Sequence, residues 1–452
     1  MAGPPFLERR ASAGVPATRA DVTAGADVTT GPDVGAPPDL EGSATVGPGA
    51  DAGGRYGPGD RLQLGVVSFS HTVQHLYPGA LVIAYPYVIA TYHVSYGTLG
   101  VVLGVAGVVG GLLQGAAGLV ERASSRLLLA LQDVALALFT VLGAVLPGFA
   151  AFAAARLGGG VSSWPQHPIG NALLVRRFPR RRAFVLACHT AGGSLGTAIA
   201  PIITAALNAA YGWRIGLGVF AVPMALGGLV VALFLVDGSP RTAHTSHGPA
   251  VPVVRLREVA TRRQVVGALA AGTIAAAGRG LGALSTYVPA YLKTGLHLSP
   301  VDVGGLFTVI VVGSIVGPIA AGHVADRLGR SRVLAGIYAI GAVLMVAFVL
   351  VGSDLLLIAC VGALLGAFAY SESPLLQAVF SDGVEGAPDR AAFGLFFAIT
   401  YGVGALWLPL LGWIIDAAGF RFAFCVMAAS FVVSAVVVLQ MCGPGERRRL
   451  PG

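Results

Sequence analysis

The sequence Gly322-His323-Val324-Ala325-Asp326-Arg327-Leu328-Gly329-Arg330-Ser331-Arg332 is a short charged segment between two long apolar runs. The run at 301–324 ends within this segment, and the run at 333–352 begins at its end. Each is long enough to cross about 30 Å of hydrocarbon as a helix. The segment therefore predicts a tight connection between two membrane-spanning helices, with its arginines at the membrane surface.

The rest of the chain repeats this pattern. Of its 452 residues, 55% are hydrophobic and 11% charged, whereas soluble domains carry roughly 25% charged residues. We predict an all-α membrane protein of twelve transmembrane helices. Their approximate ranges are 62–90, 97–120, 127–146, 149–174, 183–207, 214–236, 264–292, 301–324, 333–352, 355–380, 391–415 and 421–441. Counts of eleven or thirteen would place the two termini on opposite sides.

The distribution of positive charge supports twelve helices that begin in the cytoplasm. With that topology, 24 of the 29 Lys and Arg residues lie in cytoplasmic segments. Three, Arg214, Lys293 and Arg421, lie outside, and Arg156 and Arg279 lie within helices. Positive residues are retained on the cytoplasmic side during insertion. The net charge of +8 is therefore a topology signal and requires no nucleic-acid partner.

The second half of the chain repeats the first at an offset of about 204 residues. His93 matches His297, and Gly212-Trp213-Arg214 matches Gly419-Phe420-Arg421. Such matches in order indicate duplication of a six-helix unit. The predicted parts are a disordered cytoplasmic tail (1–61), a first bundle (62–237), a cytoplasmic linker (238–263), a second bundle (264–441) and a cytoplasmic tail (442–452). Arg far outnumbers Lys, and we expect a bacterial inner (plasma) membrane.

The segment 322–332 resembles the signature loop of the major facilitator superfamily. The resemblance implies two parallel six-helix repeats and a cytoplasmic conformational latch. The latch residues would be Gly322, Asp326, Arg327, Gly329 and Arg330. The first-half copy at 118–126 is one residue short and carries Glu121 in place of Asp. Gly192, Gly196 and Pro201 are similar to an element associated with antiporters, although packing of small residues explains them equally.

Within the superfamily, residues 62–420 are most similar to the fosmidomycin-resistance branch. The stretches that carry the similarity include His75-Leu76-Tyr77-Pro78, Gln166-His167-Pro168-Ile169-Gly170-Asn171 and Val288-Pro289-Ala290-Tyr291-Leu292. This branch implies proton-driven export of antibiotics and other small molecules. His75 stands where the branch would have an acidic or amide residue. Proton coupling through the first helix is therefore not carried over.

Charged groups inside the helices are candidates for substrate binding. A charge at mid-bilayer costs at least ~2.5 kcal/mol, so Arg156 and Arg279 must face protein or water. The fold implied by the resemblance places both near a central cavity, where they would bind a carboxylate, phosphonate or phosphate. The alternative is neutralisation by Asp133 and Glu372. Further candidates for substrate contact are His75, Tyr85 and Tyr287, the tyrosines as aromatic walls.

Four residues are candidates for proton coupling, namely Glu372, His71, His75 and Asp133. Buried carboxyl groups and imidazoles can take up and release protons. Structural pairing is the alternative for both acids, and helix packing is the alternative for both histidines. His71 and His75 are four residues apart, a spacing that also suits zinc. The sequence offers no clear further ligand, so we predict neither a metal nor a cofactor.

The sequence as a whole predicts a monomeric secondary transporter that exports a small molecule or drug, with an anion among the candidates, in exchange for protons. Uptake of an organic anion on the same fold is one alternative, and a non-transporting membrane sensor is another. No P-loop and no G-x-S-x-G or H-E-x-x-H motif occurs, so we expect neither an ATP-driven pump nor an enzyme.

Overall fold

The computed structural model describes residues 57–116, 123–178, 181–237, 260–384 and 390–443. Within these ranges the protein is helical and contains no β-strand. The first-half copy of the signature loop, most of both predicted tails and most of the linker lie outside these ranges.

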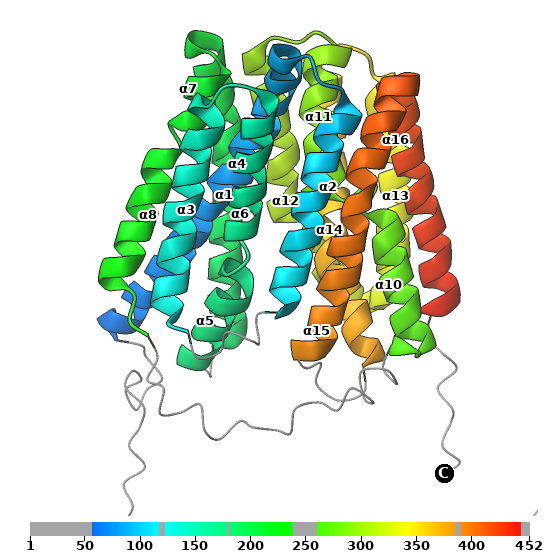
Figure 1. Ribbon diagram of the computed structural model, residues 1–452. Helices are drawn as coiled ribbons and strands as arrows, with labels where there is room; N and C mark the ends of the chain where they lie inside the picture. Colours follow the sequence, from blue (N-terminus) through cyan, green and yellow to red (C-terminus); the bar gives the residue numbers. More distant parts are fainter. Residues whose placement is uncertain (1–56, 117–122, 179–180, 238–259, 385–389, 444–452) are drawn as a thin grey trace, which may run out of the picture. The chain divides into compact units, whose positions relative to one another are not determined.

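The first half contains six helical segments (Figure 1). They are α1 (Pro58–Tyr92), α2 (Tyr96–Gly115), α3 (Ser125–Val145), α4 (Phe149–Ser162) continued by the π-helical η2 (Gln166–Gly170) and α5 (Asn171–Arg177), α6 (Arg182–Tyr211), and α7 (Trp213–Gly218) continued by α8 (Ala221–Phe234). Each corresponds to one predicted helix. The fourth is interrupted between prolines 165 and 168, because Pro lacks the N–H that an α-helix requires.

The second half contains the remaining six segments. They are α10 (Arg263–Ala275) continued by η4 (Gly280–Leu284), α11 (Ser285–Ala290) and η5 (Tyr291–Gly295); α12 (Pro300–Leu328); α13 (Arg330–Leu350); α14 (Leu355–Gly383); α15 (Arg390–Phe397) continued by η6 (Ala398–Gly402) and η7 (Val403–Leu406); and α16 (Trp407–Met441). Non-helical Gly419 divides α16 between the last two predicted helices. The twelve-helix prediction is confirmed.

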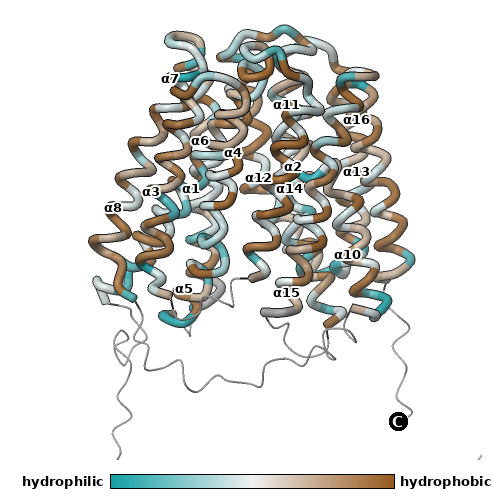
Figure 2. The backbone as a smooth tube through the Cα atoms, viewed as in Figure 1, coloured by the Kyte–Doolittle hydropathy of each residue, from teal (hydrophilic) through white to brown (hydrophobic). Residues whose placement is uncertain are grey.

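Most of these segments are long and apolar enough to cross a membrane. Among the described residues, nine stretches meet that requirement, and the stretch Ala392–Met441 contains two of the predicted helices. Large apolar side chains such as Ile319 and Leu356, each 72% exposed, face outward. Figure 2 shows apolar residues along the lengths of the helices and hydrophilic ones chiefly at their ends. This surface is suited to lipid.

The backbone preserves the duplication. Residues with a left-handed conformation occur in pairs about 204 residues apart: His93 with His297, Gly148 with Gly352, and Gly212 with Gly419. Glycine adopts this conformation without a steric cost, and a non-glycine residue there is uncommon. The two histidines end the first helix of each half at the same place. The serine two residues later then accepts a hydrogen bond from the next helix, as Ser95 and Ser299 both do.

Small residues set the contacts between the halves. A Cβ atom at Gly100 would lie 2.5 Å from the Leu408 carbonyl oxygen, and one at Gly304 would lie 2.3 Å from Cβ of Ala205. These contacts bring α2 against α16 and α6 against α12. Within the first half, a Cβ at Gly196 would lie 2.1 Å from the Thr72 carbonyl oxygen. Close packing therefore accounts for this glycine of the antiporter-like element.

Candidate functional site: a histidine-lined cavity beside buried charges

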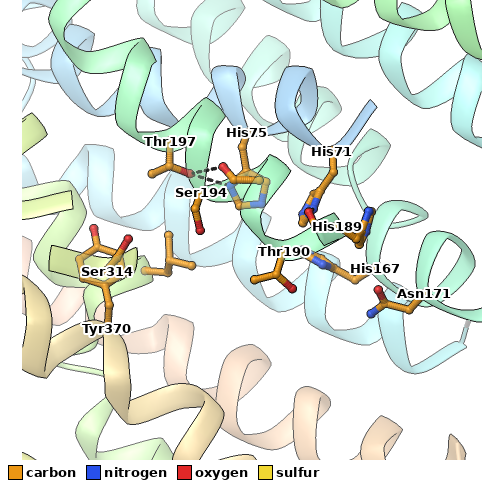
Figure 3. Close-up of a pocket in the computed structure, with 12 residues that line it drawn as sticks. His71, His75, His167, Asn171, His189, Thr190, Ser194, Thr197, Ser314 and Tyr370 are labelled. Atoms are coloured by element: carbon orange, nitrogen blue, oxygen red, sulfur yellow. Dashed lines mark hydrogen bonds between the residues drawn. The ribbon is translucent and has the colours of Figure 1, made fainter. Parts of the chain in front are cut away.

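A cavity of about 150 Å³ lies between the two halves. Its lining from the first half is His71, His75, His167, Asn171, His189, Thr190, Gly193, Ser194 and Thr197, and from the second half Leu281, Ser314 and Tyr370. Figure 3 shows these side chains facing one another across the cavity. Among the described residues that line it, none carries a carboxylate, ammonium or guanidinium group. The cavity therefore offers neutral hydrogen-bonding groups.

Four imidazole rings gather at the first-half side of this cavity. The His71 ring centroid lies 4.6 Å from that of His75, 5.0 Å from His167 and 4.1 Å from His189. The i, i+4 spacing on α1 places the first pair on one helix face, and α6 supplies His189. His167 reaches the cluster from the interrupted fourth helix. Sequence reasoning found the pair on α1 but did not join the other two rings to it.

Arg279 and Glu372 form a buried bidentate ion pair in the second half. The arginine Nε lies 2.9 Å from Oε2, and Nη2 lies 3.1 Å from Oε1. The guanidinium also donates to the carbonyl oxygens of Thr400 and Gly272, and Tyr338 donates to Glu372. Both side chains of the pair are at most 4% exposed. These contacts favour neutralisation by protein over the predicted anion-binding role of Arg279.

The seventh helix is broken on both sides of Arg279, since α10 ends at Ala275 and Arg279 itself has an extended backbone. The predicted continuous helix at 264–292 gives way to non-helical backbone at Leu281 and Gly282, the latter with φ +147°. Gly280 packs against the Tyr370 ring, where a Cβ would lie 2.5 Å away. The three glycines at 278, 280 and 282 are the sequence signal for this break, because glycine weakens helices and permits positive φ. Broken helices at membrane depth typically line substrate sites.

Arg156 has a different environment. Its Nε donates to the Tyr85 hydroxyl at 2.9 Å, and its guanidinium lies over the Tyr77 ring. Among the described residues, no carboxylate forms an ion pair with it. Asp133, one predicted partner, bonds elsewhere. Tyr85 thus holds the arginine, whereas Tyr287 is 1% exposed and donates to the Leu408 carbonyl oxygen.

Asp133 is fully buried on α3 within a neutral hydrogen-bond network. It accepts from Ser70 Oγ at 2.9 Å and from Gln132 Nε2 at 3.0 Å. Gln132 also donates to Gln166 Oε1, which lies 3.1 Å from Ser70 Oγ and completes the network. Ser70 and Gln166 are the chain neighbours of His71 and His167, so the same two helices supply residues to this network and to the imidazole cluster. A buried carboxylate without a cation is costly, which suits a group that takes up a proton.

The signature loop caps and joins helices at one end of the second half. Gly329, with φ +92°, ends α12, and Arg330 begins α13. Arg330 Nη1 lies 2.5 Å from Asp382 Oδ1 at the end of α14. Arg327 contacts His323, while Asp326 and Gly322 are exposed and half-buried, respectively. The latch role of these residues remains a prediction.

Comparisons with known proteins agree with this architecture. The family model described as Major Facilitator Superfamily matches residues 67–407, with a further match at 280–452. The chain belongs to the major facilitator superfamily. It is thus a multi-pass membrane transporter of small molecules rather than an enzyme. No match was found among curated proteins.

Two solved transporters share the superfamily fold. The crystal structure of the nucleoside transporter NupG has 14% sequence identity and a TM-score of 0.70, covering 84% of this chain and 98% of NupG. A bacterial homologue of the human lysosomal transporter Spinster, in an inward-facing and unoccupied conformation, has 16% identity and a TM-score of 0.61. That match covers 85% of this chain and 96% of the homologue. Identities this low establish the fold alone.

In this transporter, Asp416 joins the two halves at the end opposite the signature loop. Its Oδ1 accepts from the Tyr96 backbone N–H at 2.9 Å, and its Oδ2 accepts from Gly97 N–H at 2.8 Å. The carboxylate thus caps the N-terminus of α2, where the helix dipole favours negative charge. Tyr96 also bonds through its hydroxyl to Thr294. Sequence reasoning did not single out Asp416, because its partner is backbone more than 300 residues away.

Replacing Asp416 by Asn should open this end more often, because the amide keeps the shape but loses the charge. A charge-assisted hydrogen bond is stronger than a neutral one by about 1 kcal/mol. Losing this advantage at one or both bonds should therefore raise the ratio of open to closed protein about 5- to 30-fold. A maleimide that cannot cross membranes should therefore label a cysteine introduced at Thr294 faster, in a background without native cysteines. Asp354→Asn is the matched control, because Asp354 caps only its own helix. Equal labelling rates for Asp416→Asn and Asp354→Asn would contradict the role of Asp416 in holding this end of the two halves together.

Proposed function

We propose that this superfamily member is a proton-coupled secondary transporter that exports a small polar molecule through the cavity between its halves. The observation that carries the proposal is Asp133, a buried carboxyl without a cation among the described residues, which is hydrogen-bonded to Ser70, the chain neighbour of the cavity residue His71. The predicted carrier Glu372 is engaged by Arg279 and Tyr338. We therefore assign proton uptake to Asp133, and keep His71 and His75, which line the cavity, as further candidates for proton transfer.

The neutral lining suggests the class of substrate. Hydroxyl, amide and imidazole groups bind neutral polar molecules by hydrogen bonds, and the Tyr370 ring offers an apolar face. Export is the direction implied by the similarity to the fosmidomycin-resistance branch. We also propose that the chain is a monomer in the bacterial inner membrane, with both termini in the cytoplasm as the distribution of positive charge predicts.

Transport by purified protein in proteoliposomes tests the proposal. An imposed pH gradient should drive flux of a neutral polar solute, with nucleosides, sugars and antibiotics in the panel, and movement of the solute should in turn move protons. Equal flux with and without the pH gradient would contradict proton coupling. Absence of flux for every solute under any gradient would favour a membrane sensor.

Arg156 favours an anionic substrate as a second candidate. The guanidinium keeps N–H groups beyond the one given to Tyr85, and a carboxylate or phosphonate could bind them in bidentate fashion. Uptake of an organic anion is the corresponding alternative in the opposite direction. Glycine at 160 makes room for this side chain, since a Cβ there would lie 2.9 Å from Arg156 Nη1.

Arg156→Lys should distinguish the two substrate classes. The substitution keeps the charge but loses the planar fork, so binding of an anionic substrate should weaken by about 1–3 kcal/mol, or roughly 5- to 150-fold. Affinity for neutral solutes should stay the same. Arg214→Lys serves as the control, because Arg214 bonds to Ala144 and Tyr92 at the end of the bundle. If Arg156→Lys binds the anion as tightly as the wild type does, then Arg156 does not form the anion-binding site.

A further inference from the structure

Three imidazoles of the cavity surround a common point. The potential ligand nitrogens of His71, His75 and His167 all lie within 4.8 Å of one another. They come from α1 and from the interrupted fourth helix, and they border the cavity from one side (Figure 3). Sequence reasoning set a metal aside because the pair on α1 had no clear further ligand. The structure supplies His167 as that ligand and places His189 beside it.

Hydrogen bonding fixes which nitrogen of His71 carries its proton. Nδ1 lies 2.7 Å from the backbone carbonyl oxygen of His189, and a carbonyl only accepts, so Nδ1 donates. In a neutral ring Nε2 is then an acceptor with a free lone pair. That Nε2 is buried and has no hydrogen-bond partner among the described residues.

The same tautomer follows for His75 by one more step. Thr197 donates its hydroxyl proton to the Gly193 carbonyl oxygen at 3.1 Å. The hydroxyl therefore accepts from His75 Nδ1, which lies 2.7 Å away. His75 Nε2 is likewise buried and offers a second lone pair that has no partner in the part of the chain that the structure describes. Two imidazoles held by Nδ1–H donation, with free Nε2 atoms, form the arrangement in which histidines bind metals.

Gly193 on α6 leaves the space that the His71 ring occupies. A Cβ atom at Gly193 would lie 2.6 Å from His71 Cε1, so only glycine permits the ring to lie against the helix. The His71 and His189 rings stack with an interplanar angle of 20°. Imidazole favours zinc and its transition-metal neighbours, and the described lining lacks the carboxylates that magnesium and calcium require.

We propose that His71, His75 and His167 bind a divalent transition-metal ion such as Zn²⁺ in the transport cavity. Three nitrogens leave the fourth tetrahedral position open toward the cavity, for water or for a carried molecule. Zn–N bonds of about 2.0–2.1 Å require ligand nitrogens about 3.4 Å apart, so binding draws the rings closer together. The site goes beyond the proposed transport function, and its binding is measurable without any flux.

A cobalt titration of the purified full-length protein tests the site. The protein is prepared without a polyhistidine tag, and Co²⁺ serves as the probe because nitrogen ligands in tetrahedral geometry give it strong visible absorption. One equivalent of Co²⁺ should produce that absorption, and one equivalent of Zn²⁺ should remove it. A titration without the tetrahedral absorption would overturn the proposal.

Variants then assign the ligands. Thr197→Val removes the acceptor for His75 Nδ1 while all imidazoles remain, and should weaken binding about 10- to 100-fold. His75→Gln and His167→Gln should weaken it further, with retained helical content by circular dichroism. His323→Gln, which alters an exposed histidine at the end of α12, should bind as the wild type does. Wild-type affinity in His75→Gln would also overturn the proposal.

Discussion

Arg279→Gln should be among the most destabilising single substitutions in this transporter, whatever substrate is present. Removing one partner of a buried ion pair leaves the other charge uncompensated and costs about 3–5 kcal/mol. Glu372→Gln should be similarly harmful, since it strands a guanidinium that is 4% exposed. The double variant removes both charges and should recover much of the loss. The measurements are melting temperature in detergent and the yield of monodisperse protein.

Arg330→Gln is the matched control for this experiment. It breaks an ion pair with Asp382 whose side chains are both 44% exposed, and exposed pairs contribute about 0–1 kcal/mol. Its melting temperature should therefore stay close to that of the wild type. If Arg279→Gln is as stable as this control and fails only to bind anions, then Arg279 belongs to a substrate site after all.

Asp133→Asn should abolish proton-driven accumulation while solute exchange continues. The amide oxygen can still accept from Gln132, and the amide NH2 group can donate to Ser70 Oγ, whose own proton can turn to Gln166, so the network keeps its shape. It cannot gain and lose a proton in the transport cycle. With one proton per solute, a gradient of one pH unit supports about tenfold accumulation, and the variant should show none. Because no buried ion pair is broken, its melting temperature should remain near that of the wild type.

Accumulation and counterflow in the same proteoliposomes measure this effect. Asp354→Asn is the control, because Asn caps a helix about as well as Asp and Asp354 is exposed. If Asp133→Asn accumulates the solute as well as the wild type does, then Asp133 is not the residue that couples transport to protons. The imidazole cluster would then be the next site to test. Loss of both accumulation and counterflow would indicate a role in binding or folding instead.

The number and order of the helices could be predicted well from the sequence, because hydropathy, charge and turn chemistry are signals carried by residues close together in the chain. The match of His93 with His297 in the sequence reappears as a pair of left-handed residues. Glu372 was also named in advance as a partner for Arg279, since few charges are available inside the membrane. Asp133 was named on the same grounds as a candidate to neutralise one of the two arginines, but it bonds to Ser70 and Gln132.

The contents of the site were harder to predict because they depend on contacts between distant helices. His189 joins His71 across 118 residues, and although the glycines at 192 and 196 mark a packing face of α6, the sequence does not identify α1 as the helix that packs there. The break after Arg279 was missed although its glycines were visible, because the flanking residues are apolar enough to continue a helix. Hydropathy measures affinity for lipid and does not register the loss of backbone hydrogen bonds.

The break in the seventh helix has a mechanical consequence. A continuous helix transmits bending along its length, whereas non-helical backbone at Leu281 and Gly282 acts as a hinge that absorbs it. On one side of this hinge, Lys293 lies 5.5 Å from the Tyr87 ring centroid of the first half. On the other side, the bonds of Arg279 to Glu372, Thr400 and Gly272 hold the helix to its own half. The part of the helix that follows Gly282 can therefore move away from Tyr87 while the ion pair between Arg279 and Glu372 stays in place.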